Sequence, residues 1–222
     1  MVRAEYAGCG KSYACKEMEK RGHKVLFVCP TNRLSQNNQE NGVTLHRFFS
    51  VGTKNDEVIA KFDDSDYDVI VFDEIYFADI HMLARIKKYS ETKLDKIIIA
   101  TGDTNQLETV SELSNTISYE EYADHCIDTM FSNSIFLTIN KRLNSDEDRE
   151  TLKQFKLDIF NKDIPIKTTI TKYFKMVDKI TTNDNIALRN EICENVSNTI
   201  RKITNKTADY DVGEFLICRK YF

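Results

Sequence analysis

The 222-residue sequence has little glycine and proline, with 7 Gly and 2 Pro, and it has no long apolar run. No apolar stretch approaches the roughly 18 residues that a membrane-spanning helix needs, and the N-terminus lacks the apolar core of a signal peptide. We therefore expect no membrane partner and a cytoplasmic or nuclear location. The scarcity of Gly and Pro beside many Ile, Lys and Asn is typical of an AT-rich genome, such as that of a large DNA virus or a parasite. A viral protein would act in the host cytoplasm.

Cysteine spacing and charge exclude further classes of site. The six cysteines form no CxxC pair, so we expect reduced thiols rather than a zinc knuckle or a disulfide framework. The net charge is −4, so any binding of nucleic acid must come from a local basic and polar track. Hydrophobic residues at 41% and charged residues at 30% indicate a globular protein that buries a core. Its length fits one domain of ordinary size plus part of another.

The most informative stretch is a glycine-framed turn that ends in Lys-Ser, namely Ala7-Gly8-Cys9-Gly10-Lys11-Ser12. Such a phosphate loop points backbone N–H groups inward, and the helix after it adds its positive N-terminal end, so together they cradle a polyphosphate. Lys11 would contact the β- and γ-phosphates, and the Ser12 hydroxyl would hold Mg²⁺. The full pattern has glycine where this chain has Glu5, so the turn requires that Glu5 avoid positive φ. The alternative is a glycine-rich helix cap with a lysine nearby.

Apolar strands alternate with amphipathic helices along the chain. This alternation predicts an α/β fold with a parallel, doubly wound sheet and helices on both faces. The predicted strands are 2–6, 23–29, 68–72, 96–101, 135–138 and 213–219, with a short strand and turn over 185–190, and the predicted helices are 11–21, 78–89, 147–161 and 191–202.

Polar residues follow several of these strands, where ligands of open α/β sheets collect. Asp73 and Glu74 suit metal-dependent phosphoryl transfer, in which Asp73 binds the Mg²⁺ shell and Glu74 polarises the attacking water. Gln106 follows the next strand and could sense the γ-phosphate or orient water. Arg142 could reach the transferring phosphoryl group as an arginine finger. Plain turn acids and an ordinary surface arginine are the alternatives.

Two further polar segments are candidates for contact with a single nucleic-acid strand. Hydroxyl and imidazole groups there could hold phosphates, and a phenylalanine could stack on a base. A helix start with two core phenylalanines is the alternative for the second segment. The candidate residues are Pro30, Thr31, Asn32, Thr44, His46, Phe48 and Phe49.

An ordered set of strings over about residues 4–144 resembles the superfamily 1 nucleic-acid helicases, most closely the branch with RecD-like and Dda-like enzymes. These strings are AGCGKS, VCPTN, GVTLHRFF, VIVFDE, GDTNQLETV and LTINKRL. The resemblance implies that Lys11 and Ser12 bind phosphate and Mg²⁺, and that Asp73 and Glu74 are the metal-binding acid and the catalytic base. It further implies that Gln106 couples the γ-phosphate to the strand-binding surface, that Arg142 contacts the γ-phosphate, and that Thr31, Asn32, His46 and the adjoining phenylalanines grip the strand.

The resemblance also implies a domain organisation and a mode of action. Residues 1–139 would form the first RecA-like ATPase domain, and residues 140–222 would form part of a second, so we expect a piece of a helicase whose partners include the remainder of that chain. The whole would be a monomeric motor that uses ATP and Mg²⁺ to move 5′ to 3′ on single-stranded DNA or RNA. We expect the piece itself to bind ATP, with weak or no unwinding.

Two other functions fit parts of the sequence. One is a nucleotide-dependent nucleic-acid binding module without turnover, since the later helicase motifs are missing. The other is a nucleoside kinase of the thymidine kinase type, which also pairs a phosphate loop with Asp-Glu near an aromatic residue such as Phe77. Such kinases usually have paired CxxC zinc ligands late in the chain, and this sequence has none.

Overall fold

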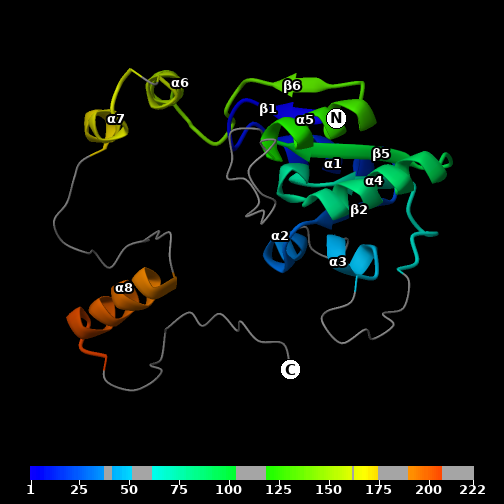
Figure 1. Ribbon diagram of the computed structural model, residues 1–222, viewed down its shortest axis with the longest axis horizontal. Helices are drawn as coiled ribbons and strands as arrows, with labels where there is room; N and C mark the ends of the chain where they lie inside the picture. Colours follow the sequence, from blue (N-terminus) through cyan, green and yellow to red (C-terminus); the bar gives the residue numbers. More distant parts are fainter. Residues whose placement is uncertain (38–41, 52–61, 104–118, 162, 175–189, 207–222) are drawn as a thin grey trace. The chain divides into compact units, whose positions relative to one another are not determined.

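The computed structural model describes residues 1–37, 42–51, 62–103, 119–161, 163–174 and 190–206 (Figure 1). Its strands are β1 (Val2–Ala4), β2 (Val25–Cys29), β3 (Gly42–Thr44), β4 (Val69–Phe72), β5 (Ile97–Gly102) and β6 (Ile135–Leu137). Its helices are α1 (Lys11–Lys20), α2 (Asn32–Asn37), α3 (Leu45–Phe48), α4 (Ile80–Thr92), α5 (Tyr119–Met130), α6 (Asp146–Ile159), α7 (Ile166–Tyr173) and α8 (Asn190–Ile203), with a short 3₁₀ turn η2 (Ile75–Phe77).

The strands form one six-stranded sheet in the order β3-β2-β4-β5-β1-β6, and every pairing is parallel. The predicted α/β fold with a parallel sheet is therefore confirmed. Because all strands run in the same direction, their carboxyl ends meet at one edge. The phosphate loop, Pro30, Asp73 and Asp103 follow four of these ends and lie along that edge.

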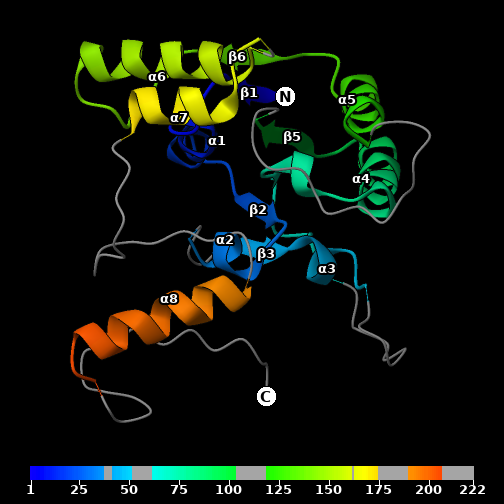
Figure 2. The same ribbon diagram turned by 60° about the vertical axis from the view of Figure 1, so that its left-hand side comes forward.

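Side chains of the interior strands alternate between two apolar layers. In β2, Leu26 and Val28 belong to one layer and Phe27 to the other. The first layer includes buried side chains of α3, α4 and α5, whereas the second includes Cys15 of α1 and Leu34 of α2. Figure 2 shows α1 on one side of the sheet and α4 with α5 on the other. Helices therefore cover both faces, as predicted.

The predicted elements differ from the observed ones mainly at their ends. The helix predicted over 78–89 is observed as α4, which begins at Ile80 because the Asp79 side chain accepts a hydrogen bond from Met82 N and caps it. The predictions omitted α2, β3, α5 and α7, and they included α3 only as the alternative for the second polar segment. Among the omitted elements, α2 and β3 are too short for a periodic pattern to develop. The strands predicted near 185–190 and over 213–219 lie outside the described residues, apart from residue 190, which begins α8.

The chain divides into two compact units, Met1–Glu150 and Thr151–Phe222. The predicted boundary between residues 139 and 140 falls inside the first unit, and the assignment of the second unit to a RecA-like domain stays a prediction. No helix within the described ranges is long and apolar enough to cross a membrane.

Candidate functional site

The phosphate loop connects β1 to α1 and turns sharply at two glycines. Gly8 and Gly10 have φ of +87° and +92°, which L side chains adopt only with strain. Glu5 is not among the described residues with positive φ, and its backbone N–H donates to Leu137 O at 2.9 Å. Glu5 therefore avoids positive φ, as the turn requires in the absence of a glycine there. The hydrogen bond to the β6 carbonyl holds the Glu5 backbone in position.

The side chains of Lys11 and Glu74 lie close together beside this loop. Lys11 Nζ lies 3.6 Å from Glu74 Oε1, and the two side chains are only 7% and 17% exposed. Burial raises the pKa of Glu74, while the charge of Lys11 opposes that rise. Glu74 also has a left-handed backbone with φ of +52°, an uncommon conformation for a non-glycine residue that is often found at functional sites.

Ser12 and Asp73 form a second polar pair beside the first. The Ser12 hydroxyl lies 3.3 Å from each Asp73 carboxylate oxygen, and the buried Thr101 hydroxyl donates to Asp73 Oδ1. Glu74 N donates to the same Thr101 oxygen at 3.3 Å, so β5 fixes the turn that presents both acids. One hydroxyl and one carboxylate suit Mg²⁺, which keeps several waters and needs few protein ligands. No cluster of three His, Cys, Asp or Glu side chains that could bind a metal occurs in the described ranges.

The loop borders a cavity of about 920 Å³. Among the described residues, three cations, Lys11, Lys141 and Arg142, line it together with one acid, Glu74. Backbone N–H groups, the N-terminal end of α1 and an excess of positive charge suit a polyphosphate. The predicted residues Ala7 to Ser12, Glu74 and Arg142 thus come together at one cavity, and Asp73 adjoins it through Ser12. Gln106 lies outside the described residues.

The residues predicted to contact nucleic acid lie in two places along the sheet edge. Pro30 is half-buried after β2, and Thr31 and Asn32 are exposed at the start of α2. Thr44 caps α3, since its hydroxyl oxygen accepts from Arg47 N at 3.2 Å. His46 is exposed on the first turn of α3.

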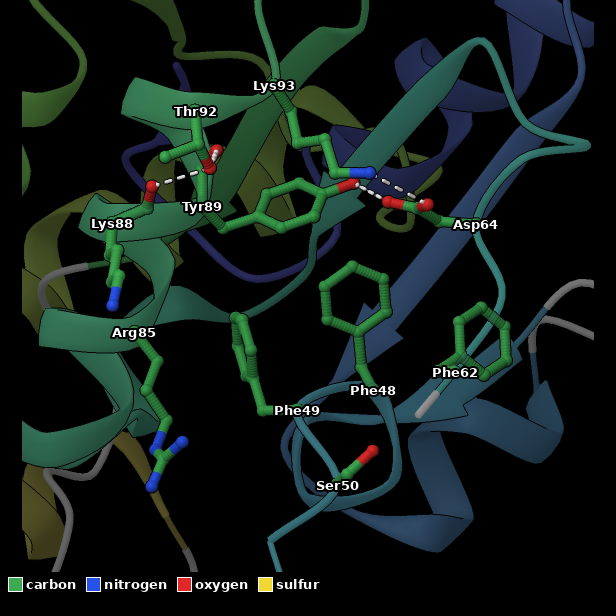
Figure 3. Close-up of a pocket in the computed structure, with 10 residues that line it drawn as sticks. All are labelled: Phe48, Phe49, Ser50, Phe62, Asp64, Arg85, Lys88, Tyr89, Thr92 and Lys93. Carbon is green, nitrogen blue, oxygen red and sulfur yellow. Dashed lines mark hydrogen bonds and ion pairs between the residues drawn. The ribbon is translucent and has the colours of Figure 1, made fainter. Parts of the chain in front are cut away.

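The two phenylalanines of the second segment differ in burial. Phe48 is 6% exposed and packs edge-on against Phe72 and Tyr89, with centroid distances of 5.9 and 5.1 Å, so the structure supports the core interpretation for this residue. Phe49 is half-buried. Figure 3 shows both rings, with Phe62 and Tyr89, around a pocket of about 350 Å³. We therefore do not assign base stacking to Phe48.

Two polar residues at the site were not singled out from the sequence. Thr101 ends a predicted strand, and Asn140 precedes the predicted arginine, but neither belongs to a spacing pattern that predicts its partners. Both are buried, and both bond to the loops that present the charged groups.

Comparison with solved structures matches the chain to Pif1. The crystal structure of Bacteroides Pif1 bound to single-stranded DNA has a TM-score of 0.59 and 18% identity, over 89% of this chain and 51% of that chain. The crystal structure of Bacteroides sp. Pif1 in complex with ADP-AlF4 has a TM-score of 0.46 and 20% identity, over 73% of this chain and 43% of that chain. The chain thus spans about half the length of the first of these proteins, and identity this low shows a shared fold alone. No curated protein matches the chain.

A family model described as an AAA domain matches residues 2–123. The matched stretch runs from β1 into α5 and includes the phosphate loop, Asp73 and Glu74, whereas Arg142 lies beyond it. Because this stretch is more than half of the 222 residues, the chain belongs to the AAA domain family.

Proposed function

We propose that the protein is the ATP-hydrolysing part of a superfamily 1 helicase that couples Mg-ATP hydrolysis to movement on a single nucleic-acid strand. The observation that supports this most is the phosphate-loop cavity, where Lys11 Nζ lies 3.6 Å from Glu74 Oε1 and Arg142 lines the same space. A cation for the phosphates, a carboxylate for the attacking water and an arginine for the developing charge are the groups that phosphoryl transfer to water requires.

Each side chain has one role in this proposal. Lys11 binds the β- and γ-phosphates, and Arg142 stabilises charge on the transferring group. Ser12 and Asp73 hold Mg²⁺, which when bound neutralises the phosphate charge. Glu74 accepts the proton of the attacking water, and its raised pKa makes it a stronger base than an exposed glutamate. Gln106 keeps its predicted coupling role.

The proposed partner is single-stranded DNA, with RNA as the other possible strand. The fold shared with Pif1 bound to single-stranded DNA supports this choice. The groups proposed to contact the strand are Pro30, Thr31, Asn32, Thr44, His46 and Phe49, which follow the carboxyl ends of β2 and β3. We further propose the RecD-like and Dda-like branch, 5′ to 3′ movement, and a monomeric motor completed by the remainder of a helicase chain.

Steady-state ATP hydrolysis with and without a single-stranded oligonucleotide tests the proposal. We expect slow turnover that the strand stimulates, and no duplex unwinding by this chain alone. Glu74→Gln should lower kcat by about 10²-fold or more, the usual contribution of a general base. The matched control is Glu91→Gln on α4, where the glutamate is 63% exposed and does not line the cavity, and its turnover should equal that of the wild type.

Three results would contradict the proposal. Unchanged turnover in Glu74→Gln would exclude this residue as the base. Nucleotide binding without turnover in the wild type would favour a binding module. Transfer of phosphate to thymidine instead of water would favour a nucleoside kinase.

A further inference from the structure

The segment between β6 and α6, residues 138–145, lies on the phosphate loop, and we call it the strap. Asn140 joins the two, because its Nδ2 donates to Ala7 O at 2.9 Å. The next residue adds a backbone bond, from Lys141 N to Gly8 O at 2.9 Å. Asn140 is only 6% exposed, so leaving its amide without hydrogen-bond partners would be costly. The strap is therefore fixed to the carbonyls of the two loop residues that precede Cys9.

The other end of the same amide shapes the strap itself. Asn140 Oδ1 accepts from Arg142 N at 2.8 Å and from Leu143 N at 3.0 Å, which closes a tight turn. That turn brings Arg142 against the loop so closely that a methyl group added at Gly8 would lie 2.9 Å from the Cβ atom of Arg142. The position of Arg142 thus depends on one amide that also bonds to the loop.

Arg149, in the first turns of α6, fixes the far side of this turn. Its guanidinium donates from Nε to Asn140 O at 3.1 Å and from a terminal nitrogen to Leu143 O at 2.8 Å. The carbonyls at both ends of the turn are therefore bonded, which limits the conformational freedom of the turn.

We propose that Asn140 is a positioning residue that couples the conformation of the phosphate loop to the placement of Arg142. This inference rests on the proposed function of the cavity. An amide is the group that the geometry requires, because it donates to the loop through nitrogen and accepts from the strap through oxygen. Aspartate has the same shape but lacks the donor, so it keeps the strap turn and breaks the bond to Ala7 O. When phosphates bind and the loop adjusts, Asn140 transmits that adjustment to Arg142.

A double-mutant cycle on the 222-residue chain tests this coupling. The variants are Asn140→Asp, Arg142→Ala and the combination, each assayed for kcat and for the Kd of ADP and of a non-hydrolysable ATP analogue. We expect each single variant to lower kcat at least 10-fold while its Kd for ADP stays within about 3-fold of wild type, since ADP lacks the γ-phosphate that Arg142 would contact. The kcat of the double variant should lie within about 3-fold of the kcat of Arg142→Ala, because Asn140 acts through Arg142.

Asn144→Asp is the matched control. It places the same carboxylate on an exposed position of the same strap, and its kcat should equal that of the wild type. If Asn140→Asp does not fold, Arg149→Ala loosens the turn from the other side and should lower kcat in the same direction, again with no further loss in the Arg142→Ala background. Any of three results would overturn the inference. The first is that the effects of Asn140→Asp and Arg142→Ala on kcat multiply, and the second is that the kcat of Asn140→Asp equals that of the wild type. The third is that Asn140→Asp weakens the binding of ADP and of the ATP analogue equally.

The two binding measurements separate this inference from the proposed function. If the wild type binds nucleotide without turnover, hydrolysis as the function fails. The coupling would then be supported if Asn140→Asp weakens binding of the ATP analogue at least 10-fold more than binding of ADP. It would be overturned if the two affinities fall to a more similar extent.

Discussion

The phosphate loop is shaped by backbone groups and small residues, whereas the segment around α3 is shaped by large aromatic rings. In the loop, Gly8 and Gly10 provide positive φ, and the carbonyls of Ala7 and Gly8 accept hydrogen bonds from the strap. The loop borders a cavity of about 920 Å³ that is lined by charged groups. Around α3, Phe48 lies in the core that the first apolar layer forms against the sheet.

These two constructions predict different consequences of mutation. A loop shaped by hydrogen bonds and glycine conformation contributes few apolar contacts, so a change there should alter ligand binding more than stability. A ring packed on several sides contributes many dispersion contacts, so a change there should alter stability first. The following three predictions test this difference.

Phe48→Ala should cause the largest loss of stability. Phe48 is 6% exposed and contacts the rings of Phe49, Phe62, Phe72 and Tyr89. Removing a buried phenylalanine ring lowers the free energy of unfolding by about 3–5 kcal/mol, measurable by equilibrium urea unfolding.

Phe136→Ala on β6 is the matched control for Phe48→Ala, because Phe136 is 57% exposed. It should change the free energy of unfolding by about 0.5 kcal/mol or less, as most surface substitutions do. Equal stability of the two variants, with weaker binding of single-stranded DNA in Phe48→Ala alone, would return Phe48 to the strand-contacting set.

Gly8→Ala should change nucleotide binding more than stability. Both Gly8 and Gly22 have positive φ, at +87° and +91°, so an alanine at either position should cost about 1–2 kcal/mol of backbone strain. At Gly8 the new methyl group would meet the Arg142 Cβ atom at 2.9 Å, whereas at Gly22 no atom of the part of the chain that the structure describes lies within 4 Å. We expect Gly8→Ala to weaken ATP binding at least 100-fold, about 2.7 kcal/mol, which exceeds the loss of stability.

Gly22→Ala is the control that separates the two effects. It should lose similar stability but keep wild-type ATP affinity, measured by titration with a fluorescent nucleotide. Similar ATP affinities for the two variants would show that contact between strap and loop does not affect nucleotide binding.

The sequence predicts well those features that neighbouring residues determine. The spacing of Gly8, Gly10, Lys11 and Ser12 defines a local backbone path, so the loop could be predicted without its surroundings. The buried strands could be predicted because their apolar runs are continuous. The parallel sheet then followed from the alternation of strands and helices.

Features that depend on distant partners could not be predicted. Whether Phe48 faces a base or the core depends on Phe72 and Tyr89, which pack against it from β4 and α4. The bond from Asn140 to Ala7 joins positions 133 residues apart, and no spacing rule connects them. Burial and long-range hydrogen bonds are properties of the assembled sheet, and therefore appear only in the structure.

Of the three substitutions, Asp64→Asn should have the smallest effect, and its effect on the free energy of unfolding should depend on pH. Asp64 accepts hydrogen bonds from the Tyr89 hydroxyl and from Lys93 Nζ at 3.1 Å, at the edge of the aromatic pocket (Figure 3). Burial acts to raise the pKa of Asp64, but these two partners outweigh it and the pKa is lowered. A carboxyl whose folded pKa is lowered stabilises the fold above its unfolded value of about 3.9, and this contribution is lost as the pH falls through the lower folded value.

Asp64→Asn should therefore lower the free energy of unfolding by about 1–2 kcal/mol at pH 7, typical for a hydrogen-bonded charged group, and by progressively less below about pH 4. Asp66→Asn, at an exposed position two residues away, should cost about 0.5 kcal/mol or less. Because Asp64 supports the aromatic rings and not the phosphate loop, ATP affinity should equal that of the wild type at pH 7. A weaker ATP affinity in Asp64→Asn would mean that the two regions are energetically coupled across the sheet. The two regions would then differ in how they are built, but both would affect nucleotide binding.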